Sequence, residues 1–469
     1  MYLGIDIGSG SIKVALFDGT FSVVRTSYPV GIDERTQDPT VVATTVRTAC
    51  QEFFSKNRKV ASSIQGLGLS GHGPSLLFID PAGKPASPLL TWQDNRARLQ
   101  ADRLRRQIPG FSKDGSSYEA KLLWFYEQQP SLFAEGFTAL YPKDYLIQLL
   151  CSRRVVDIST ASTFAFFDRD SCTWLERKAG FPISVLPEVV DCWEAVGETG
   201  TPFSRECGFD DGILIYPGGI DAYCAVAGTD PAHSVIVEET GTSSCVSRSY
   251  PDGRGSDLHV MKGETVTVKP ISSTGRSFSW LKELLGIEDL QALGPSLDPR
   301  KPEALLYLPY LIGERSPVWD ERAKGAFIGL RSSTGKAELL MAVMQGTAFA
   351  IRQNIELLQL EDPVTTIRAV GGSSHDARWQ QLKANITGKS YHVMRHQDAA
   401  PVGAALVAAV GNKAVPPESL AQLLPIDRIH DPDPKAFERY EELYETYCRL
   451  HETLAPTFHT LHSIQGETV

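Results

Sequence analysis

The chain has 469 residues, of which 42% are hydrophobic and 22% charged, the composition of a globular protein with large buried cores. This length exceeds what a single hydrophobic core usually serves and therefore predicts two or more domains. With 46 basic against 56 acidic residues the net charge is −10, and no Lys/Arg-rich run offsets it, which argues against a broad nucleic-acid-binding surface. A small anionic ligand stays compatible, because it needs only a local set of donors.

Cysteine usage and the amino terminus indicate a cytoplasmic location. The eight cysteines are scattered without a Cys-x-x-Cys pair, so they form neither a disulfide framework nor a zinc or iron–sulfur pattern. The chain enters an apolar run at residues 2–7 without a basic flank or a cleavage site, and no apolar run approaches the roughly eighteen residues that cross a bilayer. We therefore expect a cytoplasmic protein without a membrane segment.

The first part of the chain alternates strand and helix patterns. Apolar runs at residues 2–7, 14–17 and 21–24 are separated by the turns at 8–11 and 18–19, which predicts strands joined by hairpins. A helical pattern at 40–54 follows, and then strands at 65–70 and 76–79. This interleaving predicts an α/β fold.

A second, similar pass begins near residue 235. Residues 235–238, the Gly-Thr turn at 241–244 and residues 245–247 again predict strand, turn and strand, which suggests an internal duplication. We place a domain boundary near Gly228–Ser234 and expect an N-terminal domain of residues 1–229 and a C-terminal domain of residues 230–469. Apolar spacing in the second domain predicts helices at 332–360, 376–386, 398–410 and 434–454.

The first turn carries the features of a site for phosphate and metal. Asp6 stands inside an apolar strand, where an ionised carboxylate is costly unless a counter-ion or a metal pairs with it. The turn that follows, with Gly8, Ser9 and Ser11, can direct N–H groups and hydroxyls at one anion, and Lys13 adds a positive charge. Mg²⁺ that bridges Asp6 and a phosphate would reconcile the two negative groups. The alternative is an ordinary hairpin turn capped by Asp6.

Two later turns offer further contacts for a nucleotide. The hydroxyl-rich turn with Gly241 and Thr242 corresponds in the second domain to Gly8–Ser11 in the first, so the pair would clamp a polyphosphate in the cleft between the domains. The turn Gly371-Gly372-Ser373 opens a helix that carries Asn385, and a flat ligand such as adenine fits that place. On each segment alone, an ordinary turn is the alternative.

A carboxylate behind two glycines is the candidate general base. The apolar run at 213–216 leads into Gly218-Gly219 and then to Asp221, which opens a helix of small residues. Phosphoryl transfer to a hydroxyl needs a carboxylate that accepts the proton, with the attacking oxygen in line with the γ-phosphate, and the glycines allow close approach of the substrate. The structural alternative is that Asp221 is the N-cap of its helix.

Polar residues after two apolar runs suggest a sugar pocket. Ser70, Gly71 and His72 come at the end of the strand predicted at 65–70, and Trp92 and Asp94 follow a second apolar run. Hydroxyl partners beside an aromatic wall are what a carbohydrate site uses. A lone histidine or tryptophan is more often structural, so it is the clustering that favours a pocket.

Taken together, these segments resemble the FGGY family of carbohydrate kinases, from residue 2 to about residue 411 and in the family's order, with a pattern like that of xylulose kinases. The family also includes ribulose, gluconate and glycerol kinases. The resemblance is carried by Gly4–Lys13, Leu69–Gly73, Trp92–Arg96, Tyr141–Leu146, Gly218–Asp221, Thr240–Ser243, Leu308–Pro317 with Gly325–Leu330, Gly371–Ser374 and Asp398–Leu406.

The resemblance implies two ribonuclease H-like domains of the actin-type ATPase fold, with an interdomain cleft that binds ATP and Mg²⁺. Asp6 and Asp221 would hold the metal, and Asp221 would also be the catalytic base. Phosphates would contact Ser9–Ser11 and Thr242, and the nucleotide would lie near the turn at 371–373. The implied reaction transfers the γ-phosphate of MgATP to a hydroxyl of a small sugar, a ketopentose such as xylulose or ribulose.

The sequence departs from the family's pattern mainly in its sugar loops. The family commonly has Gln after Ser-Gly, where this chain has His72, and Gln93 stands where pentulose kinases often have Asn. Ser373 replaces a frequent third glycine in the adenosine turn. These changes affect the choice of substrate more than the reaction.

The competing hypothesis is an actin-like ATPase without sugar kinase activity, namely a chaperone, a filament protein or a sugar-sensing protein. Such an ATPase needs no pocket for a second substrate, so Asp221 and the loops at 70–73 and 92–96 favour the kinase. The expected partners are a sugar and ATP, without nucleic acid or membrane. The oligomeric state is left open, with a homodimer as the common default.

Overall fold

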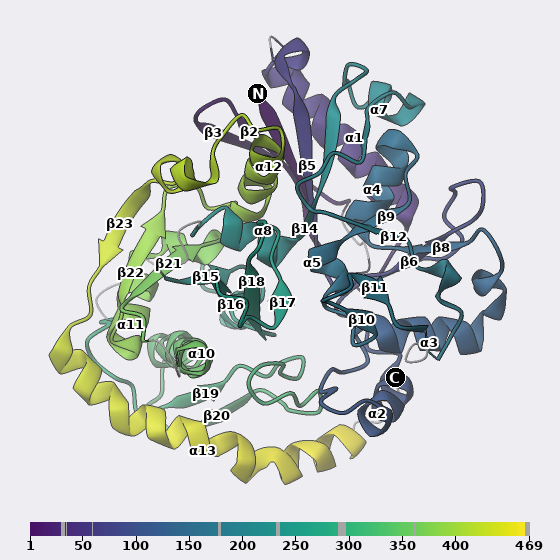
Figure 1. Cartoon of the computed structure of the whole chain (residues 1–469). Coiled ribbons are helices and arrows are strands. Elements are labelled where there is room, and N and C mark those ends of the chain that lie inside the picture. The colour runs from purple at the N-terminus through teal and green to yellow at the C-terminus, as the bar shows by residue number, and fades with distance from the viewer. Residues whose placement is uncertain are drawn as a thin grey trace. The chain divides into compact units, whose positions relative to one another are not determined.

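The computed structural model describes residues 1–29, 33, 35–58, 60–176, 180–230, 235–288, 297–359 and 363–464, and Figure 1 shows the course of the chain. The chain divides into two compact units. The first comprises Met1–Pro231, Ser249–Val266 and Asp398–Leu423, and the second comprises Ala232–Arg248, Thr267–Gln397 and Leu424–Val469. Residues 231–234, part of the predicted boundary, lie outside the described residues, and the two contiguous domains stay a prediction.

A six-stranded sheet with the order β13-β14-β5-β1-β2-β3 forms the centre of the first unit. β1, β2 and β3 are joined as antiparallel hairpins, as predicted, whereas β5 runs parallel to β1 and β14 parallel to β5. The carboxyl ends of β1, β5 and β14 therefore meet at one edge of the sheet. The strands are β1 (Tyr2–Ile7), β2 (Ser11–Phe17), β3 (Phe21–Ser27), β5 (Gly66–Gly71), β13 (Gly197–Glu198) and β14 (Leu214–Ile220).

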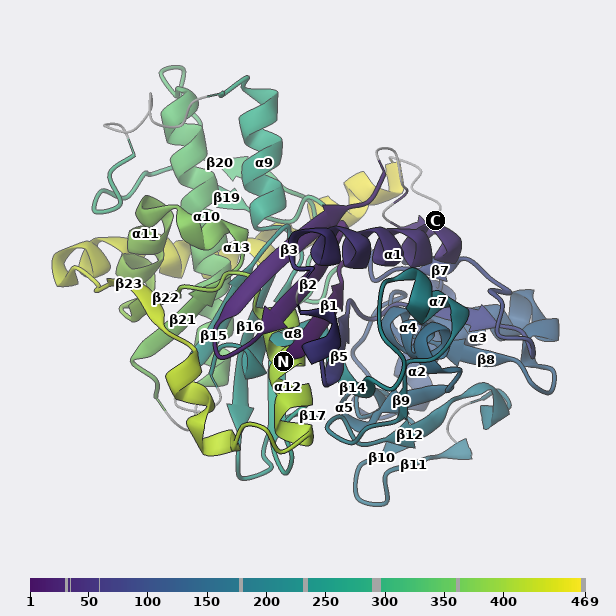
Figure 2. The same ribbon diagram turned by 90° about the horizontal axis from the view of Figure 1, so that it is seen from above.

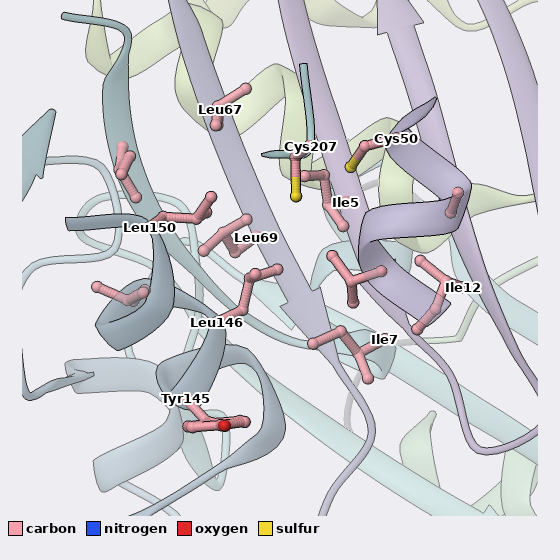
Figure 3. Packing of buried hydrophobic residues seen from close by; sticks show 14 of the residues in the cluster. Ile5, Ile7, Ile12, Cys50, Leu67, Leu69, Tyr145, Leu146, Leu150 and Cys207 are labelled. Carbon is pink, nitrogen blue, oxygen red and sulfur yellow. The ribbon is translucent and has the colours of Figure 1, made fainter. Parts of the chain in front are cut away.

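Helices cover both faces of this sheet, and the alternation of side chains along the strands assigns the faces. Ile5 and Leu69 pack against α1 (Pro39–Lys56) and α4 (Pro142–Cys151) in one apolar core, part of which Figure 3 shows. The other face meets α8 (Asp221–Ala227) and α12 (Ala399–Gly411), which lies across β1 and β5. In Figure 2, α1 and α12 lie on opposite sides of β1 and β2.

Two glycines allow α12 to lie directly on the sheet. A Cβ at Gly4 would stand 1.8 Å from the carbonyl oxygen of Pro401, and one at Gly68 would stand 1.8 Å from that of Ala404. Neither position can accept a side chain without moving the backbone of α12. The C-terminal segment 398–423 is therefore an integral layer of the first unit.

Smaller elements complete the first unit around a second core that is rich in aromatic residues. They are β4 (Thr36–Gln37), β6 (Leu77–Ile79), β7 (Leu89–Leu90), α2 (Arg98–Gln107), α3 (Tyr118–Gln128), β8 (Thr138–Leu140), β9 (Val155–Asp157), α5 (Ile158–Ala161), β10 (Phe167–Asp168), β11 (Thr173–Trp174), β12 (Glu188–Val190) and α7 (Pro202–Glu206).

The second sheet has seven strands in the order β17-β18-β16-β15-β21-β22-β23. β15 and β16 form an antiparallel hairpin, and β21 and β22 run parallel to β15, so this sheet repeats the pattern of β1, β2, β5 and β14. The repeat agrees with the internal duplication suggested by the sequence. The strands are β15 (Ile236–Thr240), β16 (Ser244–Tyr250), β17 (Asp257–Leu258), β18 (Thr265–Ile271), β21 (Thr366–Val370), β22 (Ser390–Met394) and β23 (Ile426–His430).

The helices of the second unit pack around α10 in a further core. The predicted end of the last helix at residue 454 is wrong, because α13 continues through Pro456 and buries Phe458. The predicted α/β class and its ribonuclease H-like core are confirmed. The remaining elements are α9 (Gly275–Leu284), β19 (Leu306–Leu308), β20 (Ala326–Ile328), α10 (Lys336–Leu358), α11 (Ala377–Thr387) and α13 (Pro434–Ile464).

Candidate active site

The shared edge of the three parallel strands in the first unit brings several predicted residues together. In open α/β sheets, ligands bind at the carboxyl ends of the strands. Asp6 and Ser70 pair in register near the ends of β1 and β5, and the Ser70 hydroxyl donates a 3.0 Å hydrogen bond to Oδ1 of Asp6. Asp221 follows the last residue of β14 directly. A buried carboxylate and the candidate base are thus at the same edge of the sheet, at the ends of the two strands that flank β5.

Asp6 is held as a buried acid with a nearby cation. Its side chain is 2% exposed, and Nζ of Lys13 lies 3.7 Å from its Oδ2 and 3.3 Å from Oδ1 of Asp398, the residue before α12. Burial raises the pKa of Asp6, and Lys13 and the Ser70 hydroxyl oppose that rise. Because the net effect is a rise in pKa, Lys13 and Ser70 do not fully compensate the charged form of Asp6. A further positive partner would stabilise that charged form.

Mg²⁺ is a cation that such a carboxylate could bind without a full set of protein ligands. Among the residues that the structure describes, no group of three or more His, Cys, Asp or Glu side chains is arranged to hold a metal. Mg²⁺ takes one or two carboxylates and completes its shell with waters and substrate phosphates. Asp6 and Asp221 are the two predicted carboxylates at this edge that could take part in such a shell.

The first phosphate turn is closed at its base and open at its tip. The N–H of Gly8 donates to the carbonyl of Ser11 at 3.1 Å, and Gln37 donates to the carbonyl of Ser9 at 2.9 Å. Gly10, between them, is exposed. The turn therefore has a base that protein contacts fix and an accessible tip, which is compatible with the predicted anion cradle.

Asp221 is the first residue of α8 and not its N-cap. The N-cap position is Ile220, and Oδ1 of Asp221 accepts from the N–H of Ala222 at 2.8 Å. A glycine is required at position 218, three residues before Asp221. Gly218 has φ 60°, and a Cβ there would lie 1.9 Å from the carbonyl oxygen of Leu69. The Gly-Gly pair thus lets β14 end close against β5, with the candidate base at the turn.

A buried charge cluster behind this edge was not predicted as part of the site. Nζ of Lys143 lies 2.5 Å from Oδ1 of Asp144 and 2.5 Å from Oδ2 of Asp157, and all three side chains are buried. Burial raises the pKa of Asp144 to about 7, with Lys143 opposing. The cluster touches the site, because a Cβ at Gly71 would lie 3.2 Å from Cβ of Lys143. The sequence feature that could have identified this cluster is the pair of charged residues at the start of the otherwise apolar segment 142–147.

The two predicted sugar loops are tied to one another. Oγ of Ser75 lies 2.7 Å from Nδ1 of His72 and accepts from the N–H of Trp92 at 3.1 Å. Lys121, which sequence reasoning missed, donates to the carbonyls of Pro74 at 2.9 Å and Thr91 at 2.6 Å. A lysine inside the apolar pattern of α3 was the signal that could have identified it.

His72 and Lys121 are buried and have altered ionisation. Burial lowers the pKa of His72 to about 3, and the charge of Lys121 adds to that effect, so the imidazole is neutral at physiological pH. Burial also lowers the pKa of Lys121 to about 7. The Nε2 atom of His72 is buried without a hydrogen-bond partner.

Asp94, predicted to contact the sugar, already has partners within its own loop. Its Oδ1 accepts from Nε of Arg96 at 2.9 Å, its Oδ2 accepts from Nη2 of Arg96 at 2.6 Å, and the Thr36 hydroxyl donates to Oδ2 at 3.3 Å. Arg96 also lies over the ring of Trp124. Asp94 therefore shapes the loop that carries Trp92.

Neither of two cavities of the first unit is lined by the predicted sugar-binding residues. One, of about 740 Å³, lies between residues 107–113 and 162–165. The other, of about 280 Å³, lies beside Trp193 and His259. The predicted site is thus defined by its side chains and backbone, and not by either cavity.

In the second unit, the structure brings the two remaining turns together at the carboxyl ends of β15 and β21. Gly371 has φ 89°, and a Cβ there would lie 2.5 Å from the carbonyl oxygen of Thr240, which also accepts from the Ser373 hydroxyl at 3.3 Å. Gly241 and Thr242 at the tip of the neighbouring turn are exposed. The predicted phosphate and adenosine segments are therefore adjacent in this unit.

A buried ion pair supports these turns, and sequence reasoning missed it. Nζ of Lys383 on α11 lies 2.8 and 2.9 Å from the two carboxylate oxygens of Glu238 on β15, and 3.3 Å from the Thr240 hydroxyl. Both charged side chains are fully buried. The signal was an acid inside an apolar strand, the same argument that identified Asp6.

Asn385 lies apart from the turn at 371–373. It is nine positions beyond the Asp376 N-cap of α11, roughly 13 Å along the helix axis. Its amide donates to the carbonyl of Pro299 and accepts from the N–H of Asp433, each at 2.9 Å. Those bonds join α11 to the residue before α13 and to the segment at Pro299.

Family models match nearly the whole chain. The model described as the FGGY family of carbohydrate kinases, N-terminal domain, matches residues 1–228, and that of the C-terminal domain matches residues 239–411. The chain belongs to the FGGY family of carbohydrate kinases. It is therefore a phosphotransferase that acts on an alcohol group of a carbohydrate, and ATP is the phosphoryl donor of this family. This result favours the kinase over an actin-like ATPase without sugar kinase activity.

Individual relatives are distant but match from end to end. A xylulose kinase of Staphylococcus epidermidis is 24% identical, covering 96% of this chain and 96% of its own. The structure of a xylulose kinase from Lactobacillus acidophilus superposes with a TM-score of 0.87 at 23% identity, over 98% of this chain and 99% of the other. A gluconate kinase structure from the same organism gives a TM-score of 0.86 at 23% identity, over the same shares. These structures establish the fold.

Within the ranges that the structure describes, no helix is both long and apolar enough to cross a bilayer.

Proposed function

We propose that this chain transfers the γ-phosphate of MgATP to a hydroxyl of a ketopentose such as xylulose or ribulose, with Asp221 as the general base. The observation that carries the proposal is the position of Asp221, which follows β14 at the edge where β1 and β5 present Asp6 and Ser70. The similarity to xylulose kinases favours a ketopentose as the substrate. The similarity to a gluconate kinase means that the experiment below must also include aldonic acids.

The side chains divide the work of an in-line transfer. The Asp221 carboxylate accepts the proton of the attacking sugar hydroxyl, and Ser70 with the loop of His72 and Trp92 orients the sugar. In the first unit, the hydroxyls of Ser9 and Ser11 at the exposed end of the turn bind phosphate oxygens. Gly241 and Thr242 are the phosphate contacts of the second unit. Asp6 and Asp221 hold the metal. Mg²⁺, when bound, neutralises charge on the phosphates.

The adenosine would lie on the turn formed by Gly371, Gly372 and Ser373, which is adjacent to the turn of Thr242. Asn385 acts at a distance, because its hydrogen bonds set the position of α11 beneath that turn.

The first prediction concerns the base. Asp221→Ala should lower sugar-dependent ADP release by ~10²–10⁴-fold, since that is the usual contribution of a general base, while MgADP still binds. Turnover is measured with a coupled ADP assay on ketopentoses, ketohexoses, polyols and aldonic acids, and binding by calorimetry. Asp210→Ala, which removes an exposed carboxylate of the same unit, is the control and should behave as wild type. Near-normal turnover of Asp221→Ala would show that another group is the base.

The same sugar screen decides the substrate. Stimulation of ADP release by xylulose or ribulose supports the proposal, whereas stimulation only by an aldonic acid or a polyol would contradict the ketopentose. ATP hydrolysis that no sugar stimulates would contradict the kinase itself. A cytoplasmic location, a homodimer and the two contiguous domains remain predictions, to be tested by fractionation, sedimentation and limited proteolysis.

A further inference from the structure

The long C-terminal helix α13 lies beyond the family match, which ends at residue 411, and two of its histidines share one carboxylate. Nε2 of His451 lies 3.3 Å and Nε2 of His459 lies 2.8 Å from Oδ2 of Asp320. Eight residues separate the histidines, so both project from one side of the helix. Burial raises the pKa of Asp320, but hydrogen bonds from His451 and His459 outweigh it and hold the pKa below its usual range. Asp320 is therefore a charged anchor for α13.

Asp320 is coupled to Glu314 through the backbone. Each residue donates its N–H to the carbonyl of the other at 2.9 Å, which closes the loop between them. The loop is fixed from a second side, because the N–H of Ser316 donates to the carbonyl of Pro270 at 2.9 Å and its hydroxyl donates to Asn354 at 2.5 Å. A displacement of Asp320 must therefore move Glu314.

Glu314 in turn holds the segment on which the phosphate turn rests. Its Oε1 accepts from the N–H of Ser272 at 2.6 Å. Two residues later, the N–H of Thr274 donates to the carbonyl of Thr242 at 3.3 Å, and its hydroxyl lies 2.8 Å from that of Ser244. A Cβ at Gly275 would lie 2.2 Å from the carbonyl oxygen of Gly241, so the two backbones are in direct contact.

The turn that carries Gly241 and Thr242 has a buried base and an exposed tip. Ser272, Thr274 and Ser244 are at most 4% exposed, whereas Gly241 and Thr242 are exposed. The base is thus fixed by protein contacts alone, and the tip is free to receive a ligand. The series of contacts from His459 to Thr242 lies entirely within the second unit.

We propose that α13 acts as a clamp on the phosphate turn: through Asp320, Glu314 and Ser272 it fixes Gly241 and Thr242 for the phosphates of ATP. The inference rests on the phosphate-binding role given to Thr242 under the proposed function. His451, His459, Asp320 and Glu314 are positioning residues, since none of them need touch the nucleotide. Binding groups must be held close to their productive positions, so loss of the anchor should weaken nucleotide binding.

The test replaces both histidines and compares nucleotide with sugar parameters. In His451→Asn/His459→Asn, the KM for ATP and the Kd for MgADP should rise roughly 3- to 10-fold, because only part of the lost charge-assisted hydrogen bonding reaches the turn. The KM for the sugar and kcat should stay within about twofold of wild type, because the lost contacts support only the phosphate turn. Thr460→Asn, an exposed neighbour on α13, is the matched control and should equal wild type. If the double variant fails to fold, His459→Asn alone is measured.

Glu314 supplies an independent arm. Glu314→Gln keeps an acceptor for the N–H of Ser272 and should retain the wild-type Kd for MgADP, whereas Glu314→Ala should reproduce the loss. A wild-type Kd for MgADP in the histidine variant, with only a lower unfolding temperature, would overturn the clamp. Because MgADP binding needs no sugar, a wild-type protein that phosphorylates none of the sugars would contradict the proposed function and leave this test intact.

Discussion

His72 is the residue of the predicted sugar loop whose ionisation the fold changes most clearly. Its ring is 2% exposed and hydrogen-bonded to Ser75, so it cannot gain a proton without placing a charge in the interior. The departure from the family's usual Gln therefore substitutes a neutral buried ring for a neutral amide. The loop stays polar and uncharged, but the stability of the fold becomes dependent on pH.

This dependence can be measured as stability. The folded pKa of about 3 lies below the unfolded value near 6.5, so the unfolded chain takes up a proton that the folded chain excludes as the pH falls between these values. His72→Gln should remove this loss, which amounts to about 2 kcal/mol between pH 7 and pH 5. Urea unfolding at pH 7, 6 and 5 measures it, with exposed His375→Gln as the control. Parallel pH curves for wild type and His72→Gln would contradict the neutral buried ring.

At the scale of elements, the contact between β15 and α11 depends on the Glu238–Lys383 pair. Both side chains are fully buried, and Lys383 also reaches the Thr240 hydroxyl at the end of β15. A buried pair adds little net stability relative to apolar residues, but removing one partner leaves an uncompensated charge. The pair therefore fixes how α11 is placed under the two turns of the second unit.

We predict that Lys383→Met lowers the free energy of unfolding by ~3–5 kcal/mol, because Glu238 is left charged and buried. The double variant Glu238→Leu/Lys383→Met should recover most of that loss. Denaturant unfolding of the three proteins forms the comparison. A double variant as unstable as Lys383→Met would mean that packing, and not charge, accounts for the effect.

The sequence predicted elements well where the signal is local. The periodicity at 398–410 predicted α12 within a residue at either end, but the membership of α12 in the first unit depends on its contact with Gly4 and Gly68, which no local pattern encodes. Asp6 was predicted because a lone carboxylate in an apolar strand is costly. Lys143 and Glu238 carried a local signal of the same kind, but their burial is tolerable because each also meets a partner further along the chain, Asp157 and Lys383 respectively, which no local pattern shows.

At the scale of the whole molecule, the first unit is assembled from three separate stretches of chain. We predict that a fragment of residues 1–231 binds a hydrophobic dye and aggregates, because the sheet face at Gly4 and Gly68 lacks α12. A fragment that also carries residues 398–423, joined by a flexible linker, should show less of both. Dye fluorescence and size-exclusion chromatography compare the two. A monomeric 1–231 fragment that unfolds cooperatively would contradict the need for α12.

Because α12 comes late in the chain, the first unit cannot complete its fold until late in translation. Residues 232–397 must be translated before α12 can emerge, which takes on the order of ten to thirty seconds at typical elongation rates. Throughout that interval the nascent chain carries an uncovered apolar sheet face on the ribosome. Chaperone binding to nascent chains should therefore persist until α12 emerges, and a slow stretch of codons after residue 423 would allow the first unit to close before termination.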